Sequence, residues 1–357
     1  MTGKNYYCVI LAGGVGTRLW PSSKTEKPKQ FIDILETGET LIQSTYRRFC
    51  GFIPKENVYV VTYSDYKEFV EEQLPDLPKE NCLLEPIRRN TVPSTMWATF
   101  TILSKDMDAS IVFSPSDHLI NDEKMFEEDI VGGLDYVTEH KRLLSMGVMP
   151  SRPDTNYGYL QMGDEREKGV FQVKSFSEKP ALEFAKMFHK SGEFLWNTGL
   201  FIVDGKTYID TVSRASNSFQ ELVEGVKKRV LEGKPINDVL EYTYSRSPNT
   251  TLEQGLLEKA SNIDMKLCRF EWRDLGSWSE YYNISEKDGK GNAILSDSQM
   301  LYDCENCLVK MPHGKLVVAK GLKDYLVVFD NDVLLICKKD NQQDIRRFVN
   351  DYEMKNE

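Results

Sequence analysis

The chain has 357 residues, more than one compact core usually holds, so we expect one large domain with a smaller addition. Hydrophobic residues make up 40% and charged residues 28%, which is ordinary for a globular protein, and no apolar run is long enough to predict a membrane-spanning segment. The net charge of −10 argues against a nucleic-acid partner, and seven scattered cysteines without a leader-like segment favour reduced thiols and a cytoplasmic protein.

Short apolar runs alternate with amphipathic stretches in the first half of the chain. Strands are predicted at residues 6–11, 58–62, 82–85, 109–113 and 143–148, and helices at 41–49, 66–74, 91–104 and 122–139. This alternation is typical of βαβ units, so the predicted fold class is α/β, with a doubly wound, mostly parallel, Rossmann-like sheet. Beyond Gly158 the order is less regular, with strands near 170–176 and 200–203, a helix near 182–190 and a helical zone to about residue 258.

A different pattern begins after about residue 285. Short β-like runs at 293–295, 307–310, 315–319, 325–329 and 333–337 alternate with polar or glycine turns, and a helix is predicted at 342–350. We therefore expect a large domain over residues 1–285 and a small β-rich domain with a terminal helix over residues 286–357.

The first predicted strand leads directly into a glycine-rich turn, LAGGVGTRLWP from Leu11 to Pro21, followed by KPKQF from Lys27 to Phe31. Ligands of doubly wound sheets bind at the carboxyl ends of strands, where glycines let backbone N–H groups approach phosphate oxygens. The charges of Arg18 and Lys29 suit a triphosphate. The expected nucleotide-binding residues here are Leu11, Ala12, Gly13, Gly14, Gly16, Thr17, Arg18 and Lys29.

Two commoner nucleotide-binding loops do not fit the sequence. A dinucleotide fingerprint beginning at Gly14 would need glycine or alanine at the position of Leu19. A Walker-type loop that ends in Gly205, Lys206 and Thr207 would need glycine where Leu200 stands.

The glycine-rich turn and the following PKQ resemble the signature of the nucleotidyltransferases that make activated sugars, and Trp20 resembles their mannose-1-phosphate guanylyltransferase branch. Further stretches resemble that family's motifs in the same order. They are LEPIRRNTVP at 84–93 for the nucleotide, PSDH at 115–118 for a metal, YGY at 157–159, SEKP at 177–180 and WNTG at 196–199 for the sugar phosphate, and RDLGSW at 273–278 for a second acidic site.

The resemblance implies an enzyme that transfers GMP from GTP to α-D-mannose 1-phosphate and forms GDP-mannose and pyrophosphate. It implies further nucleotide contacts from Glu85, Arg89, Asn90, Thr91 and Asp117, sugar-phosphate contacts from Gly158, Glu178, Lys179 and Asn197, and Mg²⁺ on Asp117 and Asp274. Arg18, Lys29, Asp117 and Lys179 would be the catalytic residues. The catalytic domain would be residues 1–285, and the C-terminal domain resembles a left-handed β-helix remnant through which a homodimer could form.

Elementary chemistry supports these assignments. Asp117 follows the predicted strand at 109–113, which places its carboxylate at the sheet edge of the glycine turn, and Mg²⁺ needs only one or two protein carboxylates beside phosphate and water. Asn197 offers both a donor and an acceptor to a sugar, and the guanine N–H groups need acceptors such as Glu85. No covalent intermediate is expected, because the phosphate nucleophile is already ionised and can attack the α-phosphorus in line.

Several alternatives stay open. The Glu178 and Lys179 pair could be a solvated surface couple, Asn197 an ordinary turn residue, and either Arg88 or Arg89 could face the nucleotide. The same chemistry could serve another nucleotide or another sugar, and a paralogue without activity could bind the sugar nucleotide and regulate a partner. The presence of both aspartates and all three cations favours the enzyme.

Overall fold

The computed structural model describes residues 5–339 and 342–356, and the chain forms two compact units. Unit 1 comprises Met1–Gly13, Ile42–Ser116 and Ile120–Trp272. Unit 2 comprises Gly14–Leu41, Asp117–Leu119 and Arg273–Glu357. Unit 2 thus contains three stretches that precede residue 285, namely Gly14–Leu41, Asp117–Leu119 and residues 273–284. The expected boundary between two domains at residue 285 stays a prediction.

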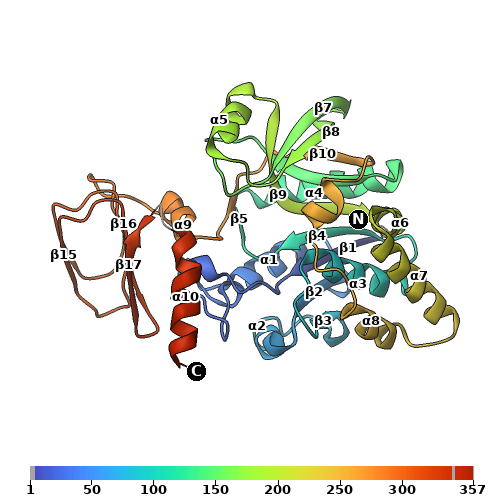
Figure 1. The fold of residues 1–357 in the computed structure, drawn as a ribbon, viewed down its shortest axis with the longest axis horizontal. Helices are drawn as coiled ribbons and strands as arrows, with labels where there is room; N and C mark the ends of the chain where they lie inside the picture. Colours follow the sequence, from blue (N-terminus) through green and yellow to red (C-terminus); the bar gives the residue numbers. More distant parts are fainter. Residues whose placement is uncertain (1–4, 340–341, 357) are drawn as a thin grey trace. The chain divides into compact units, whose positions relative to one another are not determined.

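Unit 1 is built on a nine-stranded sheet with the order β3-β2-β1-β4-β9-β6-β10-β8-β7 (Figure 1). The strands are β1 (Tyr6–Leu11), β2 (Val58–Tyr63), β3 (Cys82–Glu85), β4 (Ser110–Pro115), β6 (Leu143–Val148), β7 (Tyr159–Glu167), β8 (Val170–Ser177), β9 (Phe194–Asp204) and β10 (Ile263–Leu267). The four strands from β3 to β4 are parallel, as are β6 and β10. This confirms the predicted α/β class.

Antiparallel pairing enters the sheet at β9, which runs against β4, β6 and β7. The hairpin of β7 and β8 adds a further antiparallel pair. The register of β6 against β9 shifts between Ser145 and Gly147, so the sheet is irregular where Gly147 faces Asn197. Such irregularities re-aim side chains and are common beside ligand sites.

Helices cover both faces of this sheet. They are α1 (Leu41–Cys50), α2 (Lys67–Gln73), α3 (Thr91–Leu103), α4 (Glu123–His140), α5 (Leu182–Ser191), α6 (Gly205–Ala215), α7 (Asn217–Leu231) and α8 (Ile236–Tyr244), followed by a π-helical turn η6 (Glu253–Leu257). On one face α4 lies close to the strands, because a Cβ on its Gly133 would come within 2.5 Å of Ile202 on β9.

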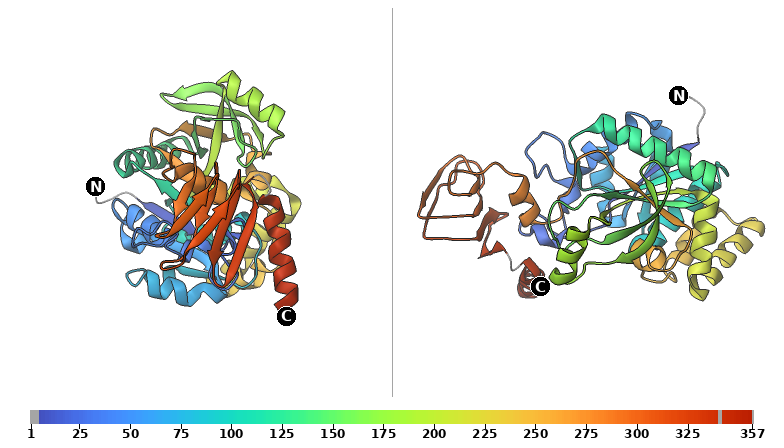
Figure 2. Two further views of the ribbon diagram at one scale, coloured as in Figure 1. Left: turned by 90° about the vertical axis from the view of Figure 1, so that its left-hand side faces the viewer. Right: turned by 90° about the horizontal axis from the view of Figure 1, so that it is seen from above.

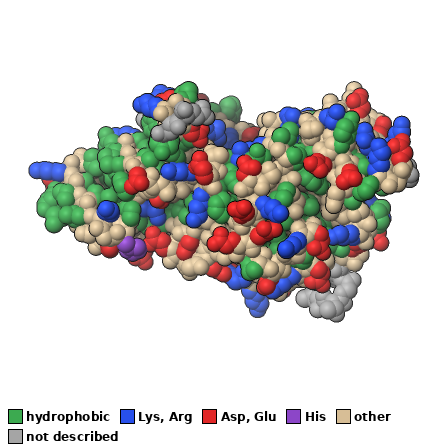
Figure 3. Space-filling model, turned by 90° about the horizontal axis from the view of Figure 1, so that it is seen from below, with side chains coloured by type: hydrophobic (Ala, Val, Ile, Leu, Met, Phe, Trp, Pro, Cys, Tyr) green, Lys and Arg blue, Asp and Glu red, His purple; other side chains and the backbone are tan. Residues whose placement is uncertain are grey.

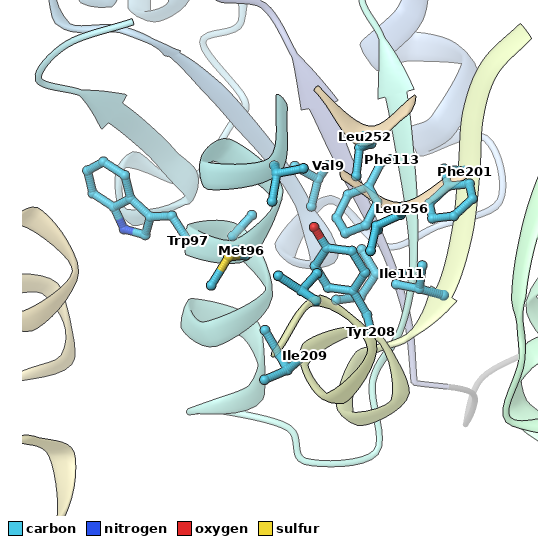
Figure 4. Packing of buried hydrophobic residues seen from close by; sticks show 14 of the residues in the cluster. Val9, Met96, Trp97, Ile111, Phe113, Phe201, Tyr208, Ile209, Leu252 and Leu256 are labelled. Carbon is cyan, nitrogen blue, oxygen red and sulfur yellow. The ribbon is translucent and has the colours of Figure 1, made fainter. Parts of the chain in front are cut away.

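The other face of the sheet carries the main hydrophobic core (Figure 4). Phe113 and Phe201 project from the sheet toward Tyr208 on α6, which is fully buried among apolar side chains. The Tyr208 hydroxyl forms a hydrogen bond of 2.6 Å with Thr95 on α3, so its one polar atom is satisfied.

Unit 2 contains a four-stranded sheet, β12-β14-β16-β17, and a two-stranded sheet of β13 and β15. Their bounds are β12 (Ala293–Leu295), β13 (Gln299–Tyr302), β14 (Leu308–Lys310), β15 (Val317–Lys320), β16 (Tyr325–Asp330) and β17 (Val333–Lys338), with helices α9 (Trp278–Ile284) and α10 (Gln342–Asn356). Figure 2 shows α10 lying alongside the strands. The parallel ladders from β12 to β16 and from β13 to β15 agree with the expected β-helix remnant.

The core of unit 2 joins this β domain to an early segment of the chain. The fully buried Trp278 donates its indole N–H to the carbonyl of Trp20 at 2.9 Å, and the Tyr281 hydroxyl donates to the carbonyl of Ile34 at 2.8 Å. Both residues belong to one apolar cluster with Leu19 and Leu326. Residues of the glycine-loop region therefore share a core with the C-terminal β domain.

Most predicted elements of the first half are confirmed within a few residues. The predictions missed β7, β10, β13 and α9, as well as the short strands β5 (His118–Ile120) and β11 (Trp272–Asp274). They also began β9 six residues late, at 200 instead of Phe194. The polar and charged residues of β7 and the short, partly exposed β13 do not show a clear alternating pattern. Within the described ranges, no helix has both the length and the apolarity needed to span a bilayer.

Candidate functional site

Two short segments of unit 2 hold the glycine loop in shape. Gly16 has a φ of +69° and opens the 3-10 turn η1 (Thr17–Leu19). A Cβ at Gly16 would lie 2.8 Å from Cγ of Lys29, so only glycine lets the loop approach this side chain. Ser23 donates to the carbonyl of Val15 at 2.7 Å and accepts from the amide of Lys29 at 2.9 Å.

Lys29 forms an ion pair with Asp117, as its Nζ donates a hydrogen bond to Oδ2 of the carboxylate. Both side chains are largely buried. Burial alone would raise the pKa of the Asp117 carboxyl, but the positive charge of Lys29 outweighs that effect and lowers the pKa to about 2. Asp117 is therefore ionised throughout the physiological range.

Arg18 and Asp274 lie beside each other in the same unit. A Cβ on Gly276 would come within 2.8 Å of Arg18 Nη2 and within 2.9 Å of both carboxylate oxygens of Asp274, which shows how closely these groups surround that glycine. The strand β11 (Trp272–Asp274) pairs with β5 (His118–Ile120), and the amide of Leu275 donates to the carbonyl of Asp117 at 3.2 Å. The two aspartates thus flank one pair of neighbouring strands.

This donor set fits a divalent cation that is shared with phosphate. Carboxylates are the hard oxygen ligands that such ions prefer, and two are enough when phosphate and water complete the coordination. The described residues contain no group of three or more His, Cys, Asp or Glu side chains placed to hold a metal by themselves. Asp117 and Asp274 are the residues that could contribute to a metal site completed by substrate.

Glu85 ends β3 in unit 1 and has its two oxygens in different surroundings. Oε1 accepts hydrogen bonds from the hydroxyls of Ser94 on α3 and Tyr244 on α8, the second at 2.6 Å. Oε2 points toward the glycine turn, because a Cβ on Gly13 would lie 2.7 Å from it. Burial raises the pKa of Glu85, although both hydroxyls oppose that rise by stabilising the charged form. The position suits an acceptor for a base.

The residues after Glu85 make contacts within the protein. Arg88 stacks over Tyr63 at 4.4 Å and donates to the hydroxyl of Tyr66 at 2.6 Å, whereas Arg89 donates to the carbonyl of Ser245 at 2.9 Å. Asn90 donates to Asn249 at 2.6 Å. Three of the four residues from 88 to 91 thus hold other parts of unit 1.

The fourth, Thr91, accepts from the amide of Leu252 at 2.8 Å. The side chains at 89–91 therefore anchor residues 245–252. None of these contacts tests the expected nucleotide contacts of Arg89, Asn90 and Thr91.

The expected sugar-phosphate residues come together in unit 1. A Cβ on Gly158 would lie 2.9 Å from Glu178 Oε2 and 2.7 Å from Phe176, so glycine is needed there. The amide of Asn197 donates to the Gly158 carbonyl at 2.8 Å. Lys179 has a φ of +43° and its ammonium pairs with Glu178 at 2.9 Å. A left-handed conformation at a non-glycine residue costs about 1 kcal/mol or more and is often found at ligand sites.

Asn197 lies inside β9, and its amide has a fixed orientation. Its Oδ1 accepts from the hydroxyl of Ser145 at 3.1 Å and from the amide of Gly199 at 3.2 Å. Its Nδ2 points to Oε1 of Glu253 at 3.4 Å. The sequence predicted both a donor and an acceptor, but in the structure the acceptor atom already serves two protein donors. Asn197 is therefore placed to act as a donor.

Sequence reasoning missed Ser94, Tyr244 and Glu253. Ser94 and Tyr244 hold Glu85, and Glu253 faces Asn197. Tyr244 is 159 residues from Glu85, and Glu253 is 56 residues from Asn197. No local spacing links such residues, so only tertiary structure brings them together.

Comparisons with known proteins agree with these observations. Residues 7–291 match the nucleotidyl transferase family, and residues 297–351 match the MannoseP isomerase/GMP-like beta-helix domain. The putative mannose-1-phosphate guanylyltransferase of Vibrio cholerae serotype O1 is 30% identical over 350 residues, which cover 98% of this chain and 74% of that protein. A mannose-1-phosphate guanylyltransferase of Escherichia coli is 30% identical over 346 residues, 96% of this chain and 72% of that protein.

A solved structure supports the same relationship. The Thermus thermophilus protein described as "mannose-1-phosphate geranyltransferase" is 28% identical, covers 98% of this chain and 100% of its own, and superposes with a TM-score of 0.86. The family match extends over most of the chain and includes the glycine loop, both aspartates and the residues around Asn197. The chain therefore belongs to the nucleotidyl transferase family and is an enzyme of that family.

Proposed function

We propose that the enzyme transfers GMP from GTP to α-D-mannose 1-phosphate and releases pyrophosphate and GDP-mannose. The observation that carries this proposal is an arrangement of charged groups in unit 2. Asp117 pairs with Lys29, Asp274 lies beside Arg18, and both aspartates flank the paired strands β5 and β11. Relatives at about 30% identity over nearly the whole chain bear the corresponding name, which supports these substrates.

In this proposal, different residues bind the triphosphate, the sugar phosphate and the base. Glycine-loop amides, Arg18 and Lys29 bind the triphosphate and offset the negative charge that develops on the departing pyrophosphate. Lys179 holds the phosphate of the incoming sugar, whose ionised oxygen attacks the α-phosphorus without a general base. Glu85, with one oxygen held by two hydroxyls, accepts hydrogen bonds from guanine.

The cofactor we propose is Mg²⁺, held by Asp117 and Asp274. When bound, this ion would neutralise phosphate charge during transfer. The pKa of Asp117 is lowered to about 2, so this carboxylate is ionised at neutral pH, which is the form that could bind a cation.

We also propose a homodimer that forms through the C-terminal β domain. Hydrophobic side chains gather on the surface of this domain, at the left of Figure 3. Met300, Tyr302 and Val318 of β13 and β15 are each about half exposed or more, at 48%, 54% and 60%. Sedimentation of the wild type and of Val318→Glu would test this, because a dimer contact on this face should weaken with the charge.

Seven free cysteines are in keeping with a reducing compartment, so we propose the cytoplasm as the location. The small-molecule partners we propose are GTP and mannose 1-phosphate as substrates and GDP-mannose and pyrophosphate as products, and we expect neither a nucleic-acid nor a membrane partner.

The substrate assignment is tested by measuring pyrophosphate release across four nucleoside triphosphates and several sugar 1-phosphates. The proposal expects the largest kcat/KM with GTP and mannose 1-phosphate. A maximum with thymidine or uridine triphosphate, with glucose 1-phosphate or with another manno-configured sugar would replace the substrates and keep the chemistry. Binding of GDP-mannose without turnover of any pair would favour a regulatory paralogue.

A further inference from the structure

We propose that Glu253 is a second sugar-recognising carboxylate, which accepts a hydrogen bond from a hydroxyl of the bound sugar 1-phosphate and helps the enzyme to select its sugar. The inference rests on the proposed function, because it takes the region of Gly158, Glu178 and Asn197 as the sugar site.

The first argument is the fixed amide of Asn197. Because Oδ1 accepts from both Ser145 and Gly199, Nδ2 is the polar atom left for other partners, and it donates to Oε1 of Glu253 at 3.4 Å. Sugar hydroxyls both donate and accept, so a site that offers a donor from Asn197 also needs acceptors. Carboxylates are strong acceptors for hydroxyl groups.

The second argument is how the backbone holds Glu253. This residue begins η6, a π-helical turn, and such turns are rare and often occur at functional sites. The residues just before it are tied to the start of α3, since the amide of Val92 donates to the carbonyl of Thr250 at 3.1 Å and the amide of Leu252 donates to Thr91. The carboxylate is thus presented from an anchored segment.

The third argument is the local balance of charge and hydrogen-bonding groups. Burial raises the pKa of Glu253, and the nearby Glu178 carboxylate raises it further, while Lys179 acts in the opposite direction. Glu253 therefore lies within electrostatic reach of both proposed sugar-phosphate residues. The Lys179 ammonium pairs with Glu178 at 2.9 Å, and the Asn197 amide donates to Glu253 at 3.4 Å. A polyhydroxyl ligand would supply the donors that such a pair of carboxylates can accept.

Glu253, which is partly exposed, could instead serve only to start the π-helical turn. Those two roles differ in what they change. Loss of a structural role would change kcat, the KM for GTP, the KM for the sugar 1-phosphate and the stability together. Loss of a recognition role would change only the KM and Kd for the sugar 1-phosphate. Glu253→Gln keeps the shape of the side chain and removes its charge, so it separates the two.

The experiment compares the purified full-length wild type, Glu253→Gln, Glu253→Asp and the control Glu258→Gln. Glu258 is exposed at the end of the same turn. Initial rates are measured with GTP and either mannose 1-phosphate or glucose 1-phosphate, and mannose 1-phosphate binding is measured by calorimetry. Loss of a charge-assisted hydrogen bond should raise the KM and the Kd for mannose 1-phosphate about tenfold in Glu253→Gln. The ratio of kcat/KM for mannose 1-phosphate to kcat/KM for glucose 1-phosphate should fall. The KM for GTP should stay within about twofold of the wild-type value.

Each outcome decides between a role of Glu253 in sugar recognition and a purely structural role. An unchanged sugar KM in Glu253→Gln, or equal rises in the KM for sugar and for GTP, would overturn the role of Glu253. Thermal melting shows whether Glu253→Gln is folded. If it is not, Glu253→Asp must show the selective rise in the KM for the sugar 1-phosphate, or the inference is wrong. A wild type that neither binds nor uses mannose 1-phosphate would overturn the proposed function and this inference with it, whereas an active wild type with an unaffected variant removes only the inference.

Discussion

The two units of the molecule present carboxylates in opposite ways. In unit 2 Asp117 is paired with a buried lysine, which lowers its pKa to about 2 and keeps it charged. In unit 1 Glu85 and Glu253 are stabilised mainly by hydroxyl and amide groups, and burial raises their pKa values. Groups that act on phosphate charge need permanent ionisation, whereas groups that recognise a base or sugar need fixed direction more than charge. This difference fits the proposed roles, in which Asp117 acts on phosphate charge while Glu85 and Glu253 select the base and the sugar.

The largest effect is expected at Asp117. Asp117→Asn removes a permanent charge beside the phosphate-binding cations, so kcat should fall about 10²- to 10³-fold while the KM for mannose 1-phosphate changes little. Pyrophosphate release at saturating substrates measures this. Asp332→Asn is the matched control, because this exposed residue has a φ of +61° that asparagine also accepts. Equal turnover in wild type and Asp117→Asn would contradict the division between the units.

The second prediction concerns Lys179, the residue of unit 1 that we propose binds the phosphate of the sugar 1-phosphate. Lys179→Ala should raise the KM for the sugar 1-phosphate about 10- to 100-fold, since a charge-assisted contact to phosphate is lost. Lys190→Ala, at an exposed lysine near the end of α5, should behave like the wild type. If only the KM for GTP rises, Lys179 must be reassigned to the nucleotide.

A smaller effect is expected from the hydroxyl pair on Glu85. Tyr244→Phe removes one donor that opposes the burial-induced rise in the Glu85 pKa, so that pKa should rise further. The KM for GTP should rise about threefold to tenfold. As the pH is lowered, Glu85 becomes protonated at a higher pH in the variant than in the wild type. The KM for GTP should therefore begin to rise at a higher pH in the variant.

The control for this series is Tyr242→Phe on the same helix, which keeps the ring that stacks against Arg246 at 3.9 Å. Its pH profile should match the wild type. Identical profiles for Tyr244→Phe and the wild type would show that Glu85 does not bind the base through its ionised form.

The smallest effect is expected at a carboxylate outside both clusters. Burial alone would raise the pKa of Asp204, but hydrogen bonds from Lys141 and Thr207 outweigh it and lower the pKa. The stability from this group is present above its unfolded pKa of about 3.9 and is lost as the pH falls through the lower folded value. Asparagine preserves the cap of α6 but loses the exposed lysine's charge pair, so Asp204→Asn should cost about 0.5 kcal/mol at pH 7 and less below pH ~3.

Urea unfolding at the two pH values measures this difference, and kcat and both KM values should stay at wild-type levels. A change in substrate kinetics would show that the pH response of the scaffold is not separate from either cluster.

The sequence determined the elements of the parallel half of the sheet and the motifs that end its strands. Apolar runs flanked by helical periodicity predicted β1, β3 and β6 with the bounds that the structure has. Strong local patterns of this kind depend on the backbone geometry of a few consecutive residues. The glycine loop, Asp117 and Asp274 were also recognisable from short motifs. That Gly14–Leu41, Asp117 and Asp274 belong to one compact unit was not recognisable, because it depends on a core shared by Trp278 and Leu19.

Only the tertiary structure decided how the proposed recognition groups are oriented. Asn197 was visible as a polar residue near a tryptophan, but its donor direction follows from Ser145 and Gly199. Glu253 has no local motif and acquires its place through hydrogen bonds to the start of α3. The physical reason is the range of the interactions: a short motif fixes which groups follow one strand, whereas the direction of a buried side chain depends on partners tens of residues away.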